Sequence, residues 1–411
     1  MTAYILGGAQ TDFARNWAKE GLGLVDLLRE AVEGALADAS VDAADVEVLH
    51  VGNHAGELFA GQSQLGGLTV SAVPAFTGLP STRHEAACAS GGTALLAADA
   101  DLGAGRYDLA LVVGVELMRN VSADDAAANL GSAAWAGREA VGATFPWPAL
   151  FAEVADAYDE RWGLDPAHLG AIARGAFANA RRNPYAQARD WNFEPAAFTP
   201  DDTANPLVEG RLRRTDCGRI TDGAAALLLA SPRYAAAWAR ARGREPSGVP
   251  CLRGFGHRTD SLLLADKLAR RDPGGPLFPH LAGAVSDAYR RAGIGGVADL
   301  DVAELHDCFT ISSLVAFEHI GLAAPGEGGR VVEEGVTDPG GSLPVNPGGG
   351  LLALGHPVGA TGVRMAVDAA RQVAGTAGPI QVEGARTALT VNIGGSFTTA
   401  VATVISRGGA A

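Results

Sequence analysis

Apolar positions along the chain follow two alternating patterns, one with the period of a helix and one with the length of a buried strand. The apolar segment 46–53 follows a short turn and is typical of a strand. The helical segment before it, 24–39, carries an apolar stripe of Leu24, Leu27, Leu28, Ala31, Val32, Ala35 and Leu36. The same alternation continues through the chain and predicts an α/β protein.

Two of these units return in the second half of the chain. Residues 280–294 have a helical pattern and lead into the apolar stretch 300–308, so that VEVLH at 46–50 matches VAELH at 302–306. A glycine-rich loop that enters a helix and precedes a strand occurs at 88–116 and again at 355–395. Units about 256 residues apart indicate an internal duplication. The alternative is that α/β proteins reuse such units without duplication.

The stretch between these halves differs in character. Residues 123–214 are rich in Ala, Trp, Asn and Arg and predict helices and long loops, which in a compact α/β protein are typical of a lid or binding loop. Apolar strand character resumes at 222–232. We therefore expect an N-terminal half at 1–122 plus 215–245, a loop or lid domain at 123–214, and a C-terminal half at 246–411.

Composition narrows the class of protein. Hydrophobic residues make up 47% and charged residues 19% of the chain, which excludes a disordered protein. The net charge of −14 argues against general nucleic-acid binding and against docking on anionic membranes. The negative net charge does not exclude a substrate that carries phosphate, because such a substrate needs only a local basic pocket.

Four cysteines in 411 residues are too few for a disulfide framework, and none forms a CxxC pair. Reduced thiols in the cytoplasm are the natural interpretation. We expect neither a secretory signal nor a membrane span, because the N-terminus lacks a basic region before a long apolar core and no stretch of about 18 apolar residues occurs.

Cys88 lies in EAACASGGTALL, just before Gly91, Gly92 and a helix-forming run. A thiol at the start of a helix lies at the positive end of the helix dipole, which favours the thiolate. The glycines allow a tight turn and close backbone approach. Cys88 is therefore a candidate nucleophile, and the alternative is a small buried core residue.

Two further loops offer polar groups on small-residue backbones. His356 lies in NPGGGLLALGHPVGATG, where a weakly covered ring suits a general base or an oxyanion donor. No GK[ST] follows the glycines, so a P-loop is excluded. Gly394 and Gly395 follow Asn392 after a strand, and their amides suit either an oxyanion hole or a hairpin turn.

The stretch ELHDCFTISSL places His306, Asp307 and Cys308 in a row at the end of an expected strand. Neighbouring residues on a strand point to opposite faces, so the three side chains cannot reach one ion unless the chain turns. A zinc site also needs about four ligands, and no second ligand cluster occurs. The sequence therefore predicts no metal site here.

Together these segments resemble the thiolase superfamily over nearly the whole chain. The CAS loop before a helix, the GHP loop and the terminal Gly-Gly turn occur in thiolase order and spacing. Most thiolases carry Asn-Glu-Ala-Phe where this chain has HDCF at 306–309, and a second catalytic cysteine where it has Asn392. HDCF is typical of the sterol-carrier-protein type.

The resemblance implies a thiolase fold, with duplicated βαβαβαββ halves in five α-β-α-β-α layers and an inserted loop domain. It implies an acyltransferase that cleaves 3-oxoacyl-CoA with coenzyme A, or runs the reverse Claisen condensation, through an acyl-cysteine. No permanently bound cofactor is implied, because coenzyme A and acyl-CoA are substrates. We expect a homodimer or tetramer, and an accessory zinc-ribbon and OB-fold subunit occurs in this branch.

The resemblance also implies a catalytic role for individual residues of this chain. Cys88 would be the nucleophile, His356 its base, His306 a donor to the enolate oxygen and Cys308 the acid/base thiol. Asp307 is expected to orient the loop. The remaining candidates are the backbone amides of Cys88 and Gly394 as a second oxyanion hole, and Phe145, Trp147 and Phe151 as substrate-binding side chains.

Three other classes of function stay open. The first is an acyltransferase or ketosynthase of specialised metabolism with a non-CoA acceptor, which the departures RHEAACAS and Asn392 and the aromatic lid would fit. The second is the thiolase-like retro-aldolase family, which lacks the nucleophilic cysteine, so Cys88 counts against it. The third is a non-catalytic scaffold, which would not need Cys88, His306, Cys308 and His356 together.

Overall fold

The computed structural model describes residues 3–270, 272 and 274–408 of the chain. Nine strands are hydrogen-bonded in the order β3-β2-β4-β7-β1-β8-β11-β10-β9, and β5 and β6 form a separate hairpin. The strands are β1 (Tyr4–Gln10), β2 (Val48–Gly52), β3 (Ser81–His84), β4 (Leu109–Glu116), β5 (Leu207–Glu209), β6 (Leu212–Arg213), β7 (Gly223–Ala230), β8 (Pro250–Thr259), β9 (Val302–Leu305), β10 (Thr387–Gly394) and β11 (Thr399–Arg407).

The nine strands divide into two halves with the same arrangement. In the first half β3, β2 and β4 are parallel, whereas β7 is antiparallel to both β4 and β1. In the second half β9 and β10 are parallel, and β11 is antiparallel to both β10 and β8. Val345 bridges to Ala303 in the position that corresponds to β3. The halves meet at β1 and β8 through the pair Tyr4–Cys251, and the repeated order confirms the duplication.

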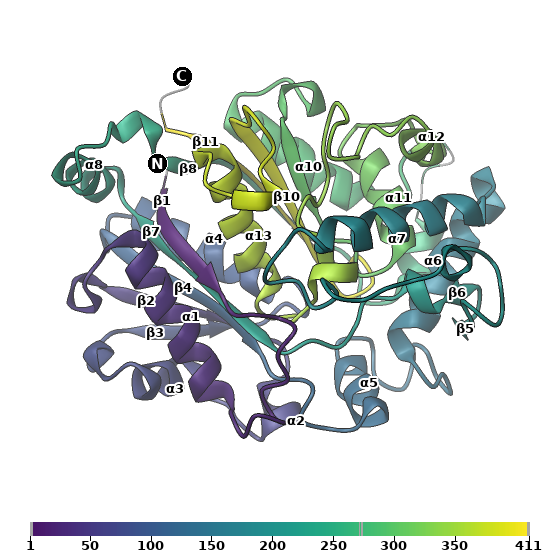
Figure 1. Ribbon diagram of the computed structural model, residues 1–411, viewed down its shortest axis with the longest axis horizontal. Helices are drawn as coiled ribbons and strands as arrows, with labels where there is room; N and C mark the ends of the chain where they lie inside the picture. The colour runs from purple at the N-terminus through teal and green to yellow at the C-terminus, as the bar shows by residue number, and fades with distance from the viewer. Residues whose placement is uncertain (1–2, 271, 273, 409–411) are drawn as a thin grey trace.

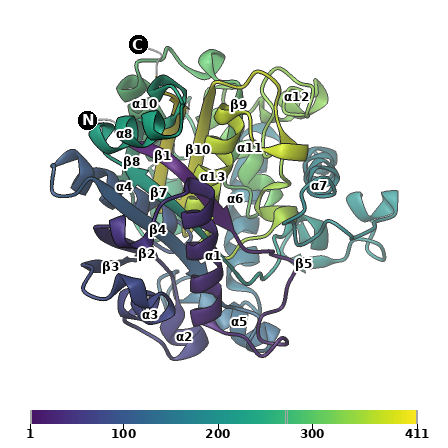
Figure 2. The same cartoon turned by 60° about the vertical axis from the view of Figure 1, so that its left-hand side comes forward.

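Helices form three layers around these strands (Figures 1 and 2). In the middle layer α4 (Ser90–Gly103) and α13 (Thr361–Ala374) contact each other and the strands of both halves. On the outside, α1 (Leu24–Ala39) packs on β1, β7 and β4, and α10 (Pro279–Ala292) packs on β8 and β11. Three hydrophobic cores fill the spaces between the layers. The predicted α-β-α-β-α order is confirmed.

The other helices are α2 (Gly56–Ala60), α3 (Leu65–Ala72), α5 (Ala123–Gly131), α6 (Pro146–Trp162), α7 (Pro166–Ala180), α8 (Pro232–Ala241), α9 (Leu264–Ala269), α11 (Thr310–His319) and α12 (Gly328–Glu333). Three of them, α5 to α7, are inserted with the β5–β6 hairpin between β4 and β7, which are neighbours in the sheet. They lie together in Figure 1, where α6 and α7 pack against α11.

The apolar patterns explain where the central strands lie. Every residue of β4 and β7 is buried, as expected for continuous apolar runs covered by helices on both faces. Gly7 and Gly8 of β1 let helices approach from opposite sides: an added Cβ would lie 2.7 Å from the Ala39 nitrogen at one and 2.6 Å from the Val367 side chain at the other. Within the described residues no helix is long and apolar enough to cross a membrane.

Candidate active site

Cys88 lies on a tight turn between β3 and α4. Ala87 has φ of +51°, a left-handed conformation that is costly for alanine. The Ser90 hydroxyl fastens this turn, because it accepts from the Ala86 amide at 2.9 Å and donates to the Ala87 carbonyl at 2.6 Å. The strained turn presents the Cys88 thiol at the start of α4, as the loop sequence predicted.

The resting charge of Cys88 differs from the expectation. Burial raises the pKa of the thiol to about 12, and the Gly395 amide, which lowers the pKa, is the smaller effect. Removal from water therefore outweighs the amide dipoles that favour a thiolate. The thiol is protonated at rest, so the site needs a base that takes the proton as the thiol reacts.

His356 is the nearest candidate for that base. It follows a five-residue π turn (Gly350–Leu354), and its backbone amide donates to the Thr221 hydroxyl at 3.0 Å. Nδ1 of the ring lies 2.7 Å from the Thr361 hydroxyl. Nε2 is buried and has no hydrogen-bond partner. Burial lowers the pKa of His356 to about 3, so the ring is neutral.

His306 and Cys308 come from the end of β9, where the chain turns toward α11. Burial, with smaller effects of His356 and Arg364, lowers the pKa of His306 well below its usual value. Burial and the nearby Cys88 raise the pKa of the Cys308 thiol well above its usual value. The Cys308 sulfur lies 3.8 Å from the Ser312 hydroxyl. All of these groups are therefore neutral at rest.

Asp307 holds the two loops together. Its Oδ1 accepts from the Leu351 amide at 2.6 Å, and the side chain is 2% exposed. Burial raises its pKa to about 6, against the opposing effect of the Leu351 amide. The carboxyl thus connects the HDCF stretch to the turn before His356, as the sequence predicted for a loop-orienting residue.

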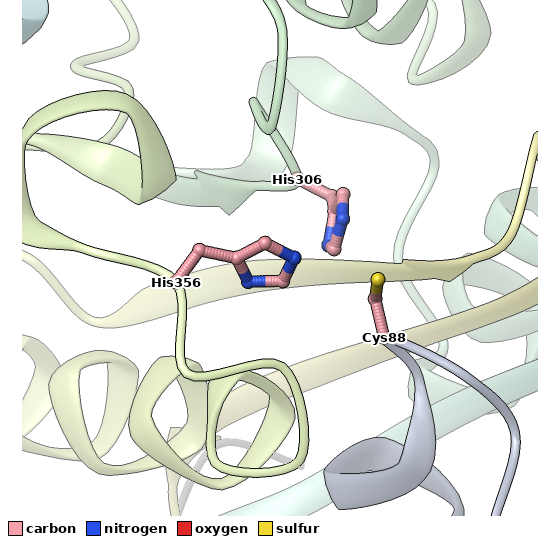
Figure 3. Close-up of side chains that lie close together, drawn as sticks. All are labelled: Cys88, His306 and His356. Atoms are coloured by element: carbon pink, nitrogen blue, oxygen red, sulfur yellow. The ribbon is translucent and has the colours of Figure 1, made fainter. Parts of the chain in front are cut away.

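The three loops bring Cys88, His306 and His356 into one cluster (Figure 3). One ligand atom from each, the sulfur and two ring nitrogens, lies within 4.8 Å of the others. The two rings are perpendicular, with centroids 5.1 Å apart. The spacing would admit a soft metal ion with three protein ligands, and a thiol beside an unpartnered imidazole nitrogen also suits acyl transfer.

Glycines allow the loops to come this close. A Cβ at Gly91, in the first turn of α4, would lie 2.8 Å from the Gly359 carbonyl oxygen of the His356 loop. The buried Glu116 at the end of β4 fixes the same loop, because it accepts from the Gly359 amide at 3.1 Å and from the His54 amide at 2.9 Å. Glu116 sits in an apolar strand, and no sequence pattern singled it out.

The Gly394–Gly395 turn adjoins the nucleophile. Gly394 ends β10, and an added Cβ there would lie 3.2 Å from the Ala89 nitrogen. The amide that acts on the Cys88 sulfur belongs to Gly395, one residue beyond the Gly394 expected from the sequence. The role of Gly394 in an oxyanion hole stays a prediction.

The three aromatic candidates lie at the start of α6. Phe151 is 2% exposed and stacks on Phe309 at a centroid distance of 4.4 Å, so it supports the HDCF stretch from the core. The Trp147 ring nitrogen donates to the Leu130 carbonyl at 2.9 Å, and the Phe145 amide donates to Glu209 at 3.0 Å. Substrate contact by these three residues stays a prediction.

A hollow of about 360 Å³ lies beside the turn that carries Cys88. Its lining includes Ala87 beside the nucleophile, both glycines of the 394–395 turn, and Leu262. His54 and Glu85 also line it and lie 3.0 Å apart.

These features together define a class of protein. The chain has a duplicated five-layer α/β fold in which loops from both halves join a thiol to two neutral imidazoles. A second thiol, Cys308, lies beside them. A thiol beside a neutral imidazole is an arrangement that suits acyl transfer through a cysteine.

Comparisons with known proteins give the family. The family of the thiolase N-terminal domain matches residues 3–195, and the family described as thiolase C-terminal domain-like matches 274–407. An acetyl-CoA acetyltransferase of Methanothermobacter thermautotrophicus is 35% identical, over 98% of this chain and 99% of that protein. A sterol carrier protein 2 of Bos taurus is 28% identical, over 95% of this chain and 70% of that protein.

Two solved structures share the fold. The Ltp2-ChsH2(DUF35) aldolase has a TM-score of 0.78 at 22% identity and covers 99% of this chain and 98% of its own. A monomeric SCP2-thiolase like protein type 1 from Mycobacterium smegmatis has a TM-score of 0.72 at 20% identity, with 99% of this chain and 77% of that chain covered. The chain belongs to the thiolase family, in its sterol-carrier-protein-type branch, and is a thiolase-type acyltransferase.

Proposed function

We propose that the protein cleaves a 3-oxoacyl-CoA with coenzyme A, and catalyses the reverse Claisen condensation, through an acyl group on Cys88. The observation that carries this proposal is the cluster of Cys88, His306 and His356, in which one sulfur or ring nitrogen atom from each lies within 4.8 Å of the others. The acetyl-CoA acetyltransferase relative supports a CoA thioester as substrate.

The first half of the cleavage transfers the acyl group. Nε2 of His356 takes the Cys88 proton, and the sulfur attacks the 3-keto carbon. The bond between C2 and C3 then breaks, which leaves acyl-Cys88 and the enolate of the departing thioester. His306 and the now protonated His356 donate to the enolate oxygen. The Cys308 thiol protonates the enolate carbon, and acetyl-CoA leaves.

The second half regenerates the enzyme. Coenzyme A loses its thiol proton to the Cys308 thiolate, and its sulfur attacks the acyl-Cys88 carbonyl. The amides of Cys88 and Gly394 hold the oxygen of that tetrahedral intermediate, and each such donor contributes roughly 3 kcal/mol. Cys88 leaves, regains a proton from His356, and the shortened acyl-CoA departs. In the condensation direction Cys308 is the base.

The test is the reaction of acetoacetyl-CoA with coenzyme A. The wild type should form two acetyl-CoA and show an acetyl mass shift on Cys88, whereas Cys88→Ala should show neither. Cys251→Ala, which alters a buried thiol in β8, is the matched control and should keep both. Absence of acetyl-CoA from a well-folded wild type would favour an acyltransferase or ketosynthase with a non-CoA acceptor.

The assembly and location belong to the same proposal. We propose a homodimer or tetramer in the cytoplasm, with the N-terminal half at 1–122 plus 215–245, the loop domain at 123–214 and the C-terminal half at 246–411. One structural neighbour is a complex with a DUF35 protein, which motivates a search for a small zinc-ribbon and OB-fold subunit. Light scattering tests the first proposal, and co-purification from the native host tests the second.

A further inference from the structure

The Asn392 side chain hydrogen-bonds to the nucleophile loop and to His306 at the same time. Its Nδ2 lies 2.9 Å from the Cys88 carbonyl oxygen and 3.2 Å from Nδ1 of His306. Its Oδ1 lies 3.3 Å from the Gly92 amide nitrogen. The side chain is 2% exposed, and the reaction steps above assign it no role.

These contacts determine how the amide group is oriented. The Cys88 carbonyl can only accept a hydrogen bond and the Gly92 amide can only donate one, so Nδ2 must face the first and Oδ1 the second. An amide nitrogen donates two hydrogens and accepts none. Its second hydrogen therefore points at Nδ1 of His306, which must be the unprotonated nitrogen. Since His306 is neutral, its proton resides on Nε2.

The hydrogen bonds around His356 favour the opposite tautomer. The Thr361 hydroxyl has one hydrogen and lies 3.2 Å from the Pro357 carbonyl, which can only accept, and 2.7 Å from Nδ1 of His356. When the hydroxyl donates to the carbonyl, it accepts from Nδ1, which places the proton of the neutral ring on Nδ1 and leaves Nε2 with a free lone pair. That buried nitrogen has no other partner, which suits the atom that receives the Cys88 proton.

We propose that Asn392 is a positioning residue that holds His306 in the Nε2–H tautomer, while Thr361 holds His356 in the Nδ1–H tautomer. The inference deepens the proposed function and rests on it for its chemical meaning. One ring is thereby a ready hydrogen-bond donor to an enolate oxygen and its neighbour a ready base. Without this division, two neutral histidines 5.1 Å apart could exchange roles, and half of the four tautomer combinations would not provide one donor and one base.

The packing around Asn392 fits this role. A Cβ at Gly92 would lie 2.8 Å from its Oδ1, and a Cβ at Gly362 would collide with the same oxygen. The charged and titratable groups that act on His306 are His356 from the loop before α13 and Arg364 of α13, with Cys88 opposite and Asp307 adjacent in sequence. Of these, Arg364 disfavours a second proton on the ring, so the tautomer rather than the charge state decides what the ring can donate.

Asn392→Asp tests the inference, because a carboxylate accepts on both oxygens and cannot donate. It should draw the His306 proton to Nδ1 and leave Nε2 as an acceptor. One added proton, on either the carboxylate or the ring, restores Nε2–H. The impairment should therefore lessen as the pH falls. Asn392→Leu, of similar volume but without polar atoms, should show no such recovery.

The direct measurement is ¹⁵N NMR of histidine-labelled full-length protein, with the ring signals assigned by His306→Asn and His356→Asn. In the wild type we expect a protonated Nε2 on His306 and a protonated Nδ1 on His356. In Asn392→Asp the His306 pattern should reverse and the His356 pattern should stay. A protonated Nδ1 on His306 in the wild type, or an unchanged His306 spectrum in Asn392→Asp, would overturn the inference.

Kinetics provide the second measurement. Asn392→Asp should lose about 10²- to 10³-fold in kcat for carbon–carbon bond cleavage, the usual effect of removing one oxyanion donor, and should still acylate Cys88. Equal losses in Asn392→Asp and Asn392→Leu at every pH would contradict a tautomer role. The NMR result does not depend on any activity, so it separates failure of this inference from failure of the proposed reaction.

Discussion

At the residue scale, burial is the largest influence on the pKa values of Cys88, His306, Cys308 and His356. The pKa of Cys88 is raised to about 12 and that of His356 is lowered to about 3, in both cases chiefly by loss of water. A neutral thiol beside a neutral imidazole can transfer its proton as the sulfur attacks. No buried pair of thiolate and imidazolium has to form beforehand. The site therefore differs from thiol enzymes that hold a preformed thiolate.

This resting state predicts how Cys88 responds to an alkylating agent. The rate of iodoacetamide labelling should rise about tenfold per pH unit through pH 9, because only the small thiolate fraction reacts and that fraction grows until the pKa is reached. Mass spectrometry of the labelled Cys88 peptide measures the rate, with glutathione as the reference thiol. A plateau below pH 8 would show a preformed thiolate instead.

Cys308→Ala separates the two chemical steps. The variant should still accept an acetyl group on Cys88 from acetyl-CoA, but lose about 10²- to 10⁴-fold in acetoacetyl-CoA cleavage, the usual contribution of a general acid. Ser312→Ala, which removes the hydroxyl 3.8 Å from the Cys308 sulfur, is the milder control. Normal turnover in Cys308→Ala would remove Cys308 from the reaction.

At the element scale, polar groups buried between elements hold the catalytic loops in place. Arg364 of α13 pairs with Glu304 of β9 and with Asp368 one turn along the helix. Burial raises the pKa values of Glu304 and Asp368, and the Arg364 guanidinium opposes both shifts. This link fixes the helix that follows the His356 loop to the strand that leads into His306.

His319 at the end of α11 makes stability depend on pH. Its Nε2 accepts from the Phe278 amide at 2.9 Å, and burial lowers its pKa to about 4. Between pH 6.5 and 4 the unfolded chain binds a proton there and the folded protein does not, so the free energy of unfolding falls as the pH falls. The loss is about 1.4 kcal/mol per pH unit, or roughly 3 kcal/mol in all.

His319→Gln should remove this contribution. Urea unfolding should show the variant clearly less stable than the wild type near pH 7, with the difference shrinking toward pH 4. His168→Gln, at a partly exposed histidine beside Glu333, is the matched control. A constant difference between wild type and His319→Gln across this range would contradict a neutral buried ring.

At the scale of the whole molecule, the middle layer makes the two halves one cooperative unit. Leu95 of α4 and Val363 of α13 belong to a single core that also includes strand residues of both halves, among them Leu229 and Ile405. Helix α13 of the second half contacts β7, β1 and β4 of the first half, so part of the inner sheet face of the first half is covered by a helix of the other half. Folding of the halves should therefore be coupled.

Leu95→Ala tests this coupling. Truncation of this 1% exposed side chain should cost about 2 to 5 kcal/mol. Because the core is shared, far-UV circular dichroism and tryptophan fluorescence should shift together to one lower midpoint. Two separated transitions would show that the halves unfold independently.

How much of the fold and of the site can be predicted from the sequence depends on how far apart in the chain the interacting residues lie. The apolar stripe of 24–39 and the buried run of 223–230 are local patterns, and both formed the predicted elements. Cys88, His306 and His356 were each recognisable because small-residue loops and a family motif surround them. Glu116 and Thr361 could not be recognised from the sequence. An acid at the end of an apolar strand and a threonine in a helix have no local sequence pattern that indicates a function.

The sequence by itself determined the fold class, the duplication, the family resemblance and the residues available for chemistry, because periodicity and motif order are properties of neighbouring residues. The tertiary structure decided the charge and tautomer of those residues. Burial contributed by both halves keeps Cys88 and His356 neutral, and an amide 304 positions from the nucleophile binds its carbonyl. Desolvation and hydrogen-bond direction depend on groups that meet only when the chain has folded.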